Sequence, residues 1–578
     1  MSKFKKKLLP IFILFLAASL RLININWDQG HFLHPDERFL NMTIKELEIP
    51  NSLSEYFDPQ LSRLNPRNHE RSFFVYGNLA PSLNKLVTSL LKQDSLEEIT
   101  ITGRLLSALA DLLVIPIIYL TVLLLEKNLK DKKLKIDPNT KFWAIFIYAL
   151  SVLPIQQAHF FTTDTFLNLF VSASFYFSLQ FFFKRKLCWL IASGIFSGLA
   201  ISSKISGVFI LPLNLSLLAL SYFWPIKKQF AKQSYKKNLI KIFRIIFIFF
   251  ISTYLSLRIS SPYIFENTSF FQINLANNFI NNLKELRSLE GNEVWFPPAI
   301  QWIDRSRFFG LKNLVFFGFG LVASMLAIKG ITLSIKKIIL SFKKPKLEAE
   351  LLALTLVLFW LFCFLTYYSQ QFVQSIRYYL IVYPFLAIFA GFGVSNFLKE
   401  RANKLLYTTI LIFTLSIWPL MFISIYIKPH SRIQASEWIY ENIPSRNLLI
   451  TEHWDDTLPI KKDYSQYYEN QELAVFSPDN ESKWLEMQSI LSKADYYILS
   501  SNRAWGSIIR LPEKYPQMSK FYQDLLSGKG NFKLVAQFKS HPSLEYLGIP
   551  ISFNDSWADE AFTVYDHPEV LIFKRISN

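Results

Sequence analysis

Apolar runs long enough to cross a lipid bilayer recur along most of this chain. The hydrocarbon core of a membrane takes about 20 predominantly apolar residues per helix. Eleven such runs lie at 8–25, 102–125, 142–159, 164–183, 188–203, 206–224, 239–258, 313–334, 350–368, 378–397 and 405–427. Charged residues make up only 18% of the chain, against about 25% in soluble proteins. The sequence therefore predicts a polytopic α-helical membrane protein with about 11 transmembrane helices.

Lysine and arginine residues lie mainly in alternate connections between these runs. The basic connections are 126–141, 184–187, 225–238, 335–349 and 398–404, and the segment before the first run is also basic. Basic loops stay in the cytoplasm, so we expect a cytoplasmic N-terminus and an extracytoplasmic C-terminus. No small-residue cleavage site follows the first run. We therefore expect an uncleaved, multi-pass protein of the plasma (inner) membrane.

Two long loops and the tail are expected on the extracytoplasmic side. The loops are 26–101 and 259–312, and they belong to a transmembrane domain over 1–428. The tail, 429–578, has the length of a small domain. Apolar segments predict strands at 447–451, 494–499, 532–538 and 570–573, and 481–493 has helical spacing. We therefore expect a C-terminal extracytoplasmic α/β domain.

The formal net charge of +18 could indicate a nucleic-acid-binding protein, but its distribution indicates a membrane protein. Residues 429–578 hold 15 basic against 20 acidic side chains, whereas the first 428 residues hold 47 against 24. The basic excess belongs to the expected cytoplasmic face of the membrane domain. We therefore expect the lipid bilayer, and no nucleic acid, as a partner.

The first polar candidate is the segment His34-Pro35-Asp36-Glu37, which follows the first apolar run. A carboxylate at this position could take the proton of an attacking hydroxyl group. Proline at the first helical position followed by two acids is also typical of an ordinary helix start, which the helix macrodipole favours. Both interpretations stay open from these residues alone.

The second candidate is the turn between the third and fourth runs, which contains His159 and Asp164. Asp164 could simply cap the fourth helix. His159, however, adds a second titratable group to a short turn beside lipid. The turn is therefore a candidate for chemistry as well as for capping.

Three cations lie on the expected outer side, against the general bias of the basic residues. Arg104 begins the second run, Lys204 separates the fifth from the sixth, and Arg377 begins the tenth. Each could be an end residue that snorkels to the interface. Phosphate is an anion that arginine binds especially well, so all three are candidate ligands of a phosphate at the outer leaflet.

Two carboxylates and several cations on one side of a polytopic protein indicate group transfer from a phosphate-linked lipid. The carboxylate would activate the acceptor, and the cations would stabilise the phosphate leaving group. The sequence has no glycine-rich phosphate loop, so we expect no nucleotide. The alternative is a lipid-linked-sugar transporter or flippase without transfer chemistry, in which polar or broken segments usually lie at mid-membrane.

These features together resemble the membrane glycosyltransferases of the GT-C fold. The residues that carry the resemblance are Asp36-Glu37 after the first run, Gly103-Arg104, Thr163-Asp164-Thr165, Arg377-Tyr378 with Pro384, Tyr76–Pro81, and Gly198 with Lys204. The group they resemble is glycosyltransferase family 39, which includes protein O-mannosyltransferases and the aminoarabinose transferase of lipid A. The resemblance covers about residues 1–430. Tail segments such as 452–459 and 564–568 look like tails of uncharacterised bacterial members.

The resemblance implies a polyprenyl-phosphate-linked sugar as donor and inversion at the anomeric carbon. It implies that Asp36 is the general base, that Glu37 supports it or orients the acceptor, and that Asp164 lies near the donor sugar or a cation. Related enzymes differ in their need for a metal, so a divalent cation stays open and no metal ligand is assigned. The acceptor, a hydroxyl of a lipid, glycan or protein, is unknown.

Further side chains are candidate substrate contacts because of their position on the outer side. They are His34, His159, Tyr76, Tyr378 and Trp295. Trp295 could equally belong to an interfacial aromatic belt. In the tail, Glu452, Asp455 and Asp456 form an acidic group, and a solvated loop is the better interpretation of it than a metal site.

Overall fold

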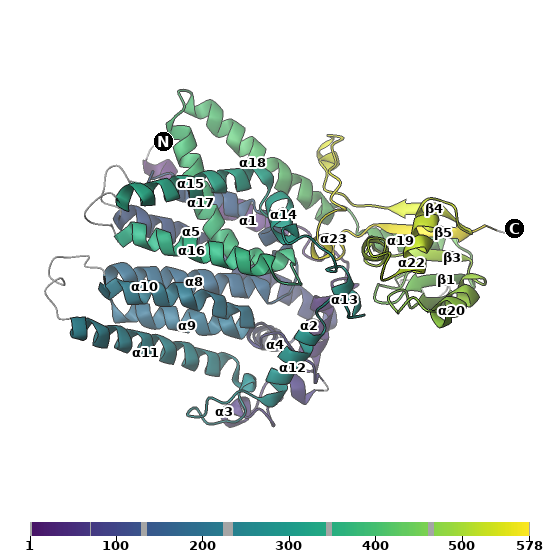
Figure 1. Cartoon of the computed structure of the whole chain (residues 1–578), viewed down its shortest axis with the longest axis horizontal. Coiled ribbons are helices and arrows are strands. Elements are labelled where there is room, and N and C mark those ends of the chain that lie inside the picture. Colours follow the sequence, from purple (N-terminus) through teal and green to yellow (C-terminus); the bar gives the residue numbers. More distant parts are fainter. Residues whose placement is uncertain are drawn as a thin grey trace.

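The chain forms a bundle of long helices with a small sheet domain at one end. The computed structural model describes residues 3–69, 71–128, 136–223, 235–342, 349–460 and 467–576. The helices of the bundle run roughly parallel to its long axis (Figure 1). The N-terminus lies at the end of the bundle far from the C-terminal domain.

Helices occur at all eleven predicted runs. They are α1 (Lys3–Leu22), α5 (Leu96–Asn128), α6 (Thr140–Ala149), α7 (Val152–Ala158), α8 (Asp164–Lys184), α9 (Leu187–Ser203), α10 (Leu211–Phe223), α11 (Tyr235–Ser260), α15 (Leu321–Phe342), α16 (Ala349–Ser369), α17 (Tyr383–Lys399) and α18 (Lys404–Ile427). Short 3-10 turns, η2 (Ile205–Ile210) and η6 (Ile376–Val382), precede α10 and α17. The chain is thus an integral membrane protein with a mostly helical membrane domain.

The number of continuous spans is smaller than the number of apolar runs. Among the described residues, six helices are long and apolar enough to cross a membrane, or up to seven if one bent pair counts as a span. The run 142–159 is broken into α6 and α7 near Ser151. The run 313–334 bends by 111° between Gly318 and Leu321, where Gly320 adopts a positive φ of 86° that favours glycine. The predicted count of 11 is therefore not confirmed.

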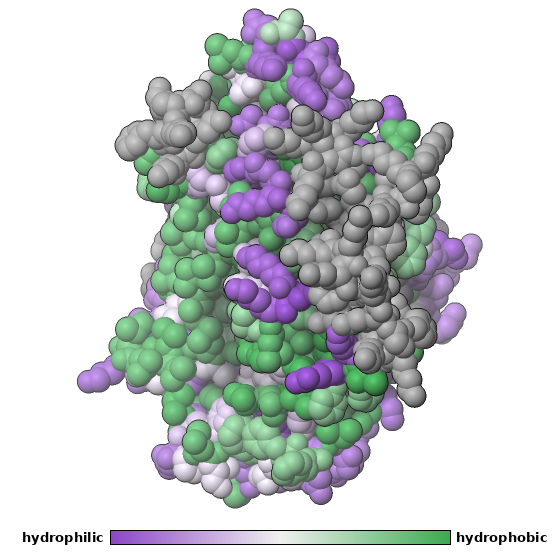
Figure 2. Space-filling view, turned by 90° about the vertical axis from the view of Figure 1, so that its left-hand side faces the viewer, coloured by the Kyte–Doolittle hydropathy of each residue, from purple (hydrophilic) through white to green (hydrophobic). Residues whose placement is uncertain are grey.

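Figure 2 faces the end of the bundle that is far from the C-terminal domain. Hydrophilic residues gather there between hydrophobic surfaces. Parts of the expected cytoplasmic loops, 129–135, 224–234 and 343–348, lie outside the described residues.

The two long loops carry short helices. The first loop contains α2 (Pro35–Glu46), α3 (Leu53–Phe57) and α4 (Leu79–Leu91), and the second contains α12 (Asn277–Ser288), α13 (Pro297–Ile300) and the start of α14 (Phe309–Asn313). Of these, α13 lies nearest the sheet domain, whereas α3, α4 and α12 lie at the lower edge of the bundle in Figure 1. Gly77 shows why the first loop sits close to α9. A Cβ atom on Gly77 would lie 2.1 Å from the carbonyl oxygen of Ser202. Only glycine allows this approach, which places Tyr76 beside the end of α9.

The C-terminal domain is a five-stranded sheet in the order β2-β1-β3-β5-β4. The strands are β1 (Leu448–Glu452), β2 (Glu469–Leu473), β3 (Tyr496–Leu499), β4 (Phe532–Phe538) and β5 (Val570–Arg575). β1 pairs in parallel with β2 and β3, whereas β5 is antiparallel to β3 and β4. α20 (Glu481–Leu491) lies between β2 and β3 in the chain, and β4, which pairs with β5, forms one edge of the sheet.

Helices cover both faces of this sheet. α19 (Ser431–Asn442) contributes Ile439 to one apolar cluster with Leu449, whereas α20 (Glu481–Leu491) and α22 (Pro516–Leu526) contribute Met487 and Met518 to the other with Ile450. Successive strand residues point to opposite faces, so the continuous apolar sequence of β1 fits a strand buried on both sides. The predicted α/β character of the tail is confirmed.

Candidate active site

The start of α2 places the side chains of two consecutive acids, Asp36 and Glu37, in different surroundings. His34 caps the helix, with its Nδ1 accepting the backbone N–H of Glu37 at 3.2 Å, and Pro35 occupies the first turn. Burial lowers the pKa of His34 to about 4, so it is neutral and suited to accept this bond. Successive helical residues point about 100° apart. The side chain of Asp36 is accordingly 22% exposed, whereas that of Glu37 is fully buried.

Asp36 forms an ion pair with Arg377, which the 3-10 turn η6 presents from the tenth apolar run. Tyr76 also donates a hydrogen bond to Asp36. Burial alone would raise the pKa of this carboxyl, but the charge of Arg377, aided by His34 and Tyr76, outweighs burial and holds the pKa well below its usual value. Asp36 is therefore an anion.

A second ion pair lies beside the first. Lys204, in the break between α9 and η2, donates from Nζ to Asp164 Oδ1 at 2.7 Å. The Nζ of Lys204 is 4.7 Å from the centre of the Tyr378 ring, and the Cζ of Arg377 is 5.6 Å from the centre of the same ring. Tyr378 thus lies between the two cations and joins the two pairs.

We call Asp36, Tyr76, Asp164, Lys204, Arg377 and Tyr378 the open cluster. The side chains of Lys204, Arg377 and Asp36 are each about a fifth exposed, at 21%, 21% and 22%. Two carboxylates balance two cations, and water or a ligand can reach all three of these groups. A charge that is partly accessible is able to exchange its partner for a substrate.

Arg104, Glu37 and Asp28 lie together in a different environment. We call these three residues the buried triad. Arg104 donates to Glu37 at 2.9 and 2.6 Å and to Asp28 at 3.0 and 2.8 Å, and all three side chains are fully buried. Its remaining hydrogen bond goes to the carbonyl oxygen of Ile25. The N–H donors of the Arg104 guanidinium are therefore all bonded to groups of the protein itself.

The buried triad fixes the turn before α8. Glu37 Oε1 accepts the backbone N–H of Phe161 at 2.7 Å. On the same side, a Cβ atom on Gly103 would lie 2.4 Å from the Phe161 ring, so the turn packs directly on α5. The triad thus links the first outer loop, α5 and the turn that carries Asp164.

The other predicted contacts lie outside the open cluster. His159 stacks on Tyr426 at 3.8 Å, and both its ring nitrogens contact backbone carbonyl oxygens, those of Ile155 and Ile23. Trp295 packs edge-to-face on Tyr515 of the C-terminal domain, with the Nζ of Lys514 4.2 Å from its ring centre. Both side chains have local packing partners and do not reach Asp36 or Asp164 in the interactions that the structure describes.

The C-terminal domain supplies two residues that the predicted site lacked. Asp559 Oδ2 accepts the backbone N–H of Ile376 at 2.7 Å and the hydroxyl of Ser375 at 3.1 Å, which fixes the turn that presents Arg377. The Tyr565 ring lies 4.3 Å from that of His34. The segment around Tyr565 was noticeable in the sequence, but nothing there indicated its distance from Asp36.

The acidic group of the tail has ordinary partners. Glu452 accepts bonds from Tyr497 and Tyr522 at 2.5 Å each, and Asp455 and Asp456 pair with Arg432. Among the described residues, no group of three or more His, Cys, Asp or Glu side chains is placed to hold a metal ion.

The arrangement of the helices defines a membrane protein of the GT-C fold. The apo oligosaccharyltransferase of Archaeoglobus fulgidus matches with a TM-score of 0.55 and 13% identity, over 100% of this chain and 89% of that chain. The same enzyme in complex with an inhibitory peptide and a dolichol-phosphate matches with a TM-score of 0.51 and 12% identity, over 100% and 89%.

A match to a family model indicates the kind of GT-C protein to which part of this chain is similar. Residues 79–264 match the model described as dolichyl-phosphate-mannose-protein mannosyltransferase. The matched segment includes Arg104, Asp164 and Lys204. The predicted resemblance to the family 39 glycosyltransferases is thus confirmed for this segment. No curated protein matches the chain.

Proposed function

We propose that this protein is a glycosyltransferase that transfers a sugar from a polyprenyl-phosphate-linked donor to an acceptor hydroxyl at the outer membrane face. The observation that carries the proposal is the open cluster, in which the partly accessible carboxylate of Asp36 and the buried carboxylate of Asp164 pair with two partly accessible cations at the end of the bundle beside the C-terminal domain. The family match supports glycosyl transfer. The similar oligosaccharyltransferase solved with a dolichol-phosphate supports a lipid phosphate as carrier.

Lys204 and Arg377 receive the donor phosphate. Both cations are held by carboxylates in the structure, so an entering phosphate competes with Asp164 and Asp36 for them. When Arg377 turns to the phosphate, Asp36 loses the charge that lowers its pKa and becomes a stronger base. Donor binding therefore activates the base as it positions the leaving group.

The reaction is a single displacement. The acceptor oxygen forms a bond to the anomeric carbon from the face opposite the phosphate, and the bond from that carbon to the phosphate oxygen breaks. The acceptor proton passes to Asp36, and the polyprenyl phosphate leaves with its charge stabilised by Lys204 and Arg377. Attack from the opposite face inverts the anomeric centre.

The buried triad positions the site without touching the substrate. Arg104 was a candidate phosphate ligand, but its donors are committed to Asp28, Glu37 and a backbone carbonyl group. We therefore reassign Arg104 and Glu37 to holding the loop and the turn that carry Asp36 and Asp164.

Orientation follows from the charge distribution. The basic connections are placed in the cytoplasm, which puts the open cluster and the C-terminal domain outside. Protease protection of the C-terminal domain in sealed, right-side-out vesicles tests this placement, because an extracytoplasmic domain is cleaved without opening the vesicle.

An assay in proteoliposomes distinguishes sugar transfer from transport of the intact donor. The purified full-length chain is reconstituted with a polyprenyl-phosphate mannose labelled in the sugar and supplied with simple alcohols and glycosides as acceptors. Release of free polyprenyl phosphate together with labelled product, abolished in Asp36→Asn, is the expected result. Movement of intact donor across the bilayer, without cleavage, would instead establish the lipid-linked-sugar transporter.

A further inference from the structure

A cavity lies between the first outer loop and the C-terminal domain, next to the open cluster. Its volume is about 210 Å³, and Pro35 and Arg38 of α2 line it together with Trp454, Asp456, Arg503 and Tyr565. Pro35 directly precedes Asp36. A group held in this cavity therefore lies against the residue that directly precedes the one we assign as the base.

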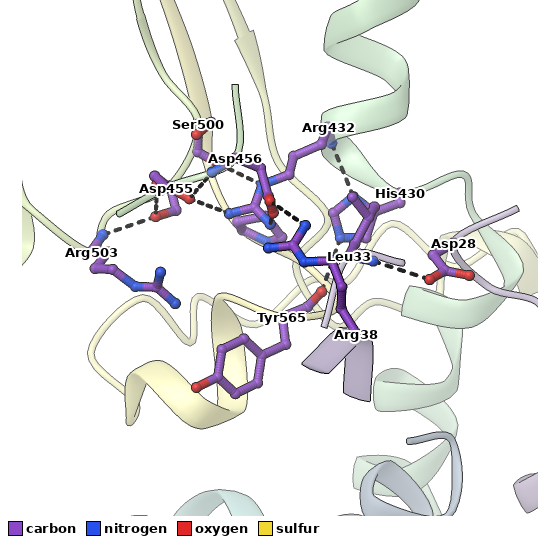
Figure 3. Close-up of polar contacts among 12 residues, drawn as sticks. Asp28, Leu33, Arg38, His430, Arg432, Asp455, Asp456, Ser500, Arg503 and Tyr565 are labelled. Carbon is purple, nitrogen blue, oxygen red and sulfur yellow. Dashed lines mark hydrogen bonds and ion pairs between the residues drawn. The ribbon is translucent and has the colours of Figure 1, made fainter. Parts of the chain in front are cut away.

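The polar wall of the cavity is built on a buried arginine. Arg432 is 2% exposed and donates to Asp455 and Asp456 at 2.6 Å each, and to the carbonyl oxygen of Ser500 at 3.1 Å. Figure 3 shows Asp456 between the guanidinium groups of Arg432 and Arg38. Arg38 reaches across from α2 and donates to Asp456 at 2.9 Å. The two carboxylates are thus fixed in place before any ligand arrives.

Several polar groups of this wall retain hydrogen-bonding capacity. The Arg38 side chain is 40% exposed and uses one nitrogen for Asp456. The Tyr565 hydroxyl makes no hydrogen bond to the part of the chain that the structure describes, and Tyr565 lines the cavity with its ring 4.3 Å from that of His34. These groups can donate to a ligand without breaking the wall.

The remaining wall is an exposed aromatic face held in a strained conformation. Trp454 is 43% exposed and adopts a positive φ of 73°, which is uncommon for a bulky residue and is often retained at functional sites. Its backbone carbonyl accepts a bond from Arg503, and Phe296 packs edge-to-face against its ring at 5.4 Å. Trp454 is therefore held at the cavity by one contact to its backbone and one to its ring.

The charges at the cavity cancel. Arg38, Arg432 and Arg503 are matched by Asp455, Asp456 and Glu560, the last of which pairs with Arg503. A neutral ligand with many hydroxyl groups suits such a wall better than an anion or a cation does, because hydroxyls donate to carboxylates and accept from guanidinium groups. The volume is below the about 300–1,000 Å³ of pockets for drug-sized ligands, so the cavity suits one small ring.

We propose that this cavity binds a neutral saccharide unit of the acceptor, with the sugar ring against Trp454 and its hydroxyls on Arg38 and Asp456. The acceptor is then a glycan or a glycolipid headgroup, and one of its hydroxyls extends past Pro35 to Asp36. This inference rests on the proposed transfer reaction for its biological meaning, but binding itself can be measured without catalysis.

The test measures binding on the full-length protein in phosphatidylcholine nanodiscs, which contain no glycoside detergent to compete. Methyl α-mannoside and methyl β-glucoside are the probes, and ligand-observed NMR gives their dissociation constants. Because Trp454→Ala removes the apolar face that the sugar ring covers, it should weaken binding by up to about tenfold, and Trp454→Phe should restore most of the loss. Arg38→Gln should weaken it similarly.

Arg71→Gln is the matched control, since Arg71, like Arg38, is an arginine of the first outer loop held in an ion pair, but its partner is Glu46 and it does not line the cavity. Equal binding by wild type, Trp454→Ala and Arg38→Gln would overturn the proposal. Saturable binding of an acetylated serine peptide in place of the glycosides would also overturn it, in favour of a peptide acceptor. Glycoside binding that depends on Trp454, in a protein that does not transfer sugar, would retain the cavity assignment and refute the proposed transfer.

Discussion

Asp36 and Glu37 are adjacent in sequence and chemically alike, yet the fold gives them opposite surroundings. Asp36 lies in the open cluster with Arg377, and about a fifth of each side chain is exposed. Glu37 lies in the buried triad with Arg104 and Asp28, where no side chain is exposed. A charge that meets both protein and solvent can exchange partners during a reaction, whereas a fully buried and fully bonded charge can only hold structure.

The largest effect should come from the base. Asp36→Asn keeps the shape and the hydrogen-bonding capacity toward Arg377 but cannot take a proton, so kcat for transfer should fall by about 10²–10⁴-fold. Thermal stability should stay close to wild type. Glu46→Gln is the control, because Glu46 is an acid of the same helix that pairs with Arg71. Turnover near wild type in Asp36→Asn would remove it as the base.

Substitutions in the buried triad should lower the free energy of unfolding. Arg104→Met leaves the carboxylates of Asp28 and Glu37 buried without a cation, which should cost about 3–5 kcal/mol. The loss is measured as a lower melting temperature of the detergent-purified chain, with the triple variant Asp28→Asn, Glu37→Gln, Arg104→Met as the comparison. The triple variant should recover part of the stability. A stable Arg104→Met variant that fails to bind polyprenyl phosphate would return Arg104 to the phosphate site.

Substitutions of the two cations of the open cluster should lower the affinity for the donor. Hydrogen bonds to charged groups are worth about 1.5–3 kcal/mol, so Arg377→Gln and Lys204→Gln should each weaken polyprenyl phosphate binding by at least about tenfold. Binding should also weaken with added salt in the wild type and less so in the variants. Lys428→Gln, which removes a cation paired with Glu545 near the base of the C-terminal domain, should leave affinity unchanged.

Glu452 differs from both Asp36 and Glu37, because it is a buried carboxylate that is held by the hydroxyls of Tyr497 and Tyr522 rather than by a cation. Burial raises the pKa of Glu452 to about 7 from its ordinary 4.5. The folded state therefore holds the proton more tightly than the unfolded state, so stability falls as pH rises from about 4.5 to about 7. Between pH 5.5 and 8 the loss should be about 2 kcal/mol.

Glu452→Gln should remove most of that pH dependence, since glutamine does not titrate. Urea unfolding of the full-length protein, followed by a probe in the C-terminal domain at both pH values, measures it. A wild-type domain that is equally stable at pH 5.5 and pH 8 would contradict the raised pKa.

The extent to which the site could be read from the sequence varied with the kind of residue. Asp36, Asp164, Lys204 and Arg377 were identified because a charge at the outer end of an apolar run is costly and therefore noticeable. Their pairing was not predictable, because it joins the first outer loop to η6 and α8 to the end of α9. Asp559 lies more than 180 positions from the turn it fixes, and no local pattern marks such a contact.

Secondary structure was likewise predictable where it depends on local sequence and not where it depends on tertiary packing. β4 was predicted with its observed bounds at 532–538, since its apolar and polar residues are typical of a strand. β2, with the sequence Glu469-Asn470-Gln471-Glu472-Leu473, was missed because an exposed edge strand needs no apolar residues. The bend after Gly318 was also missed, because an apolar run shows hydrophobicity but not where tertiary packing turns the helix.

From the sequence alone we could predict a polytopic membrane protein with a basic end, an α/β tail and a set of charges at the ends of its apolar runs. These properties depend on transfer free energies, which act on each segment independently. The folded structure was needed to show which of two neighbouring carboxylates is open, which arginine is fully bonded and which tail residues approach the site. Those properties depend on distances between segments far apart in the chain, and only the packed fold sets them.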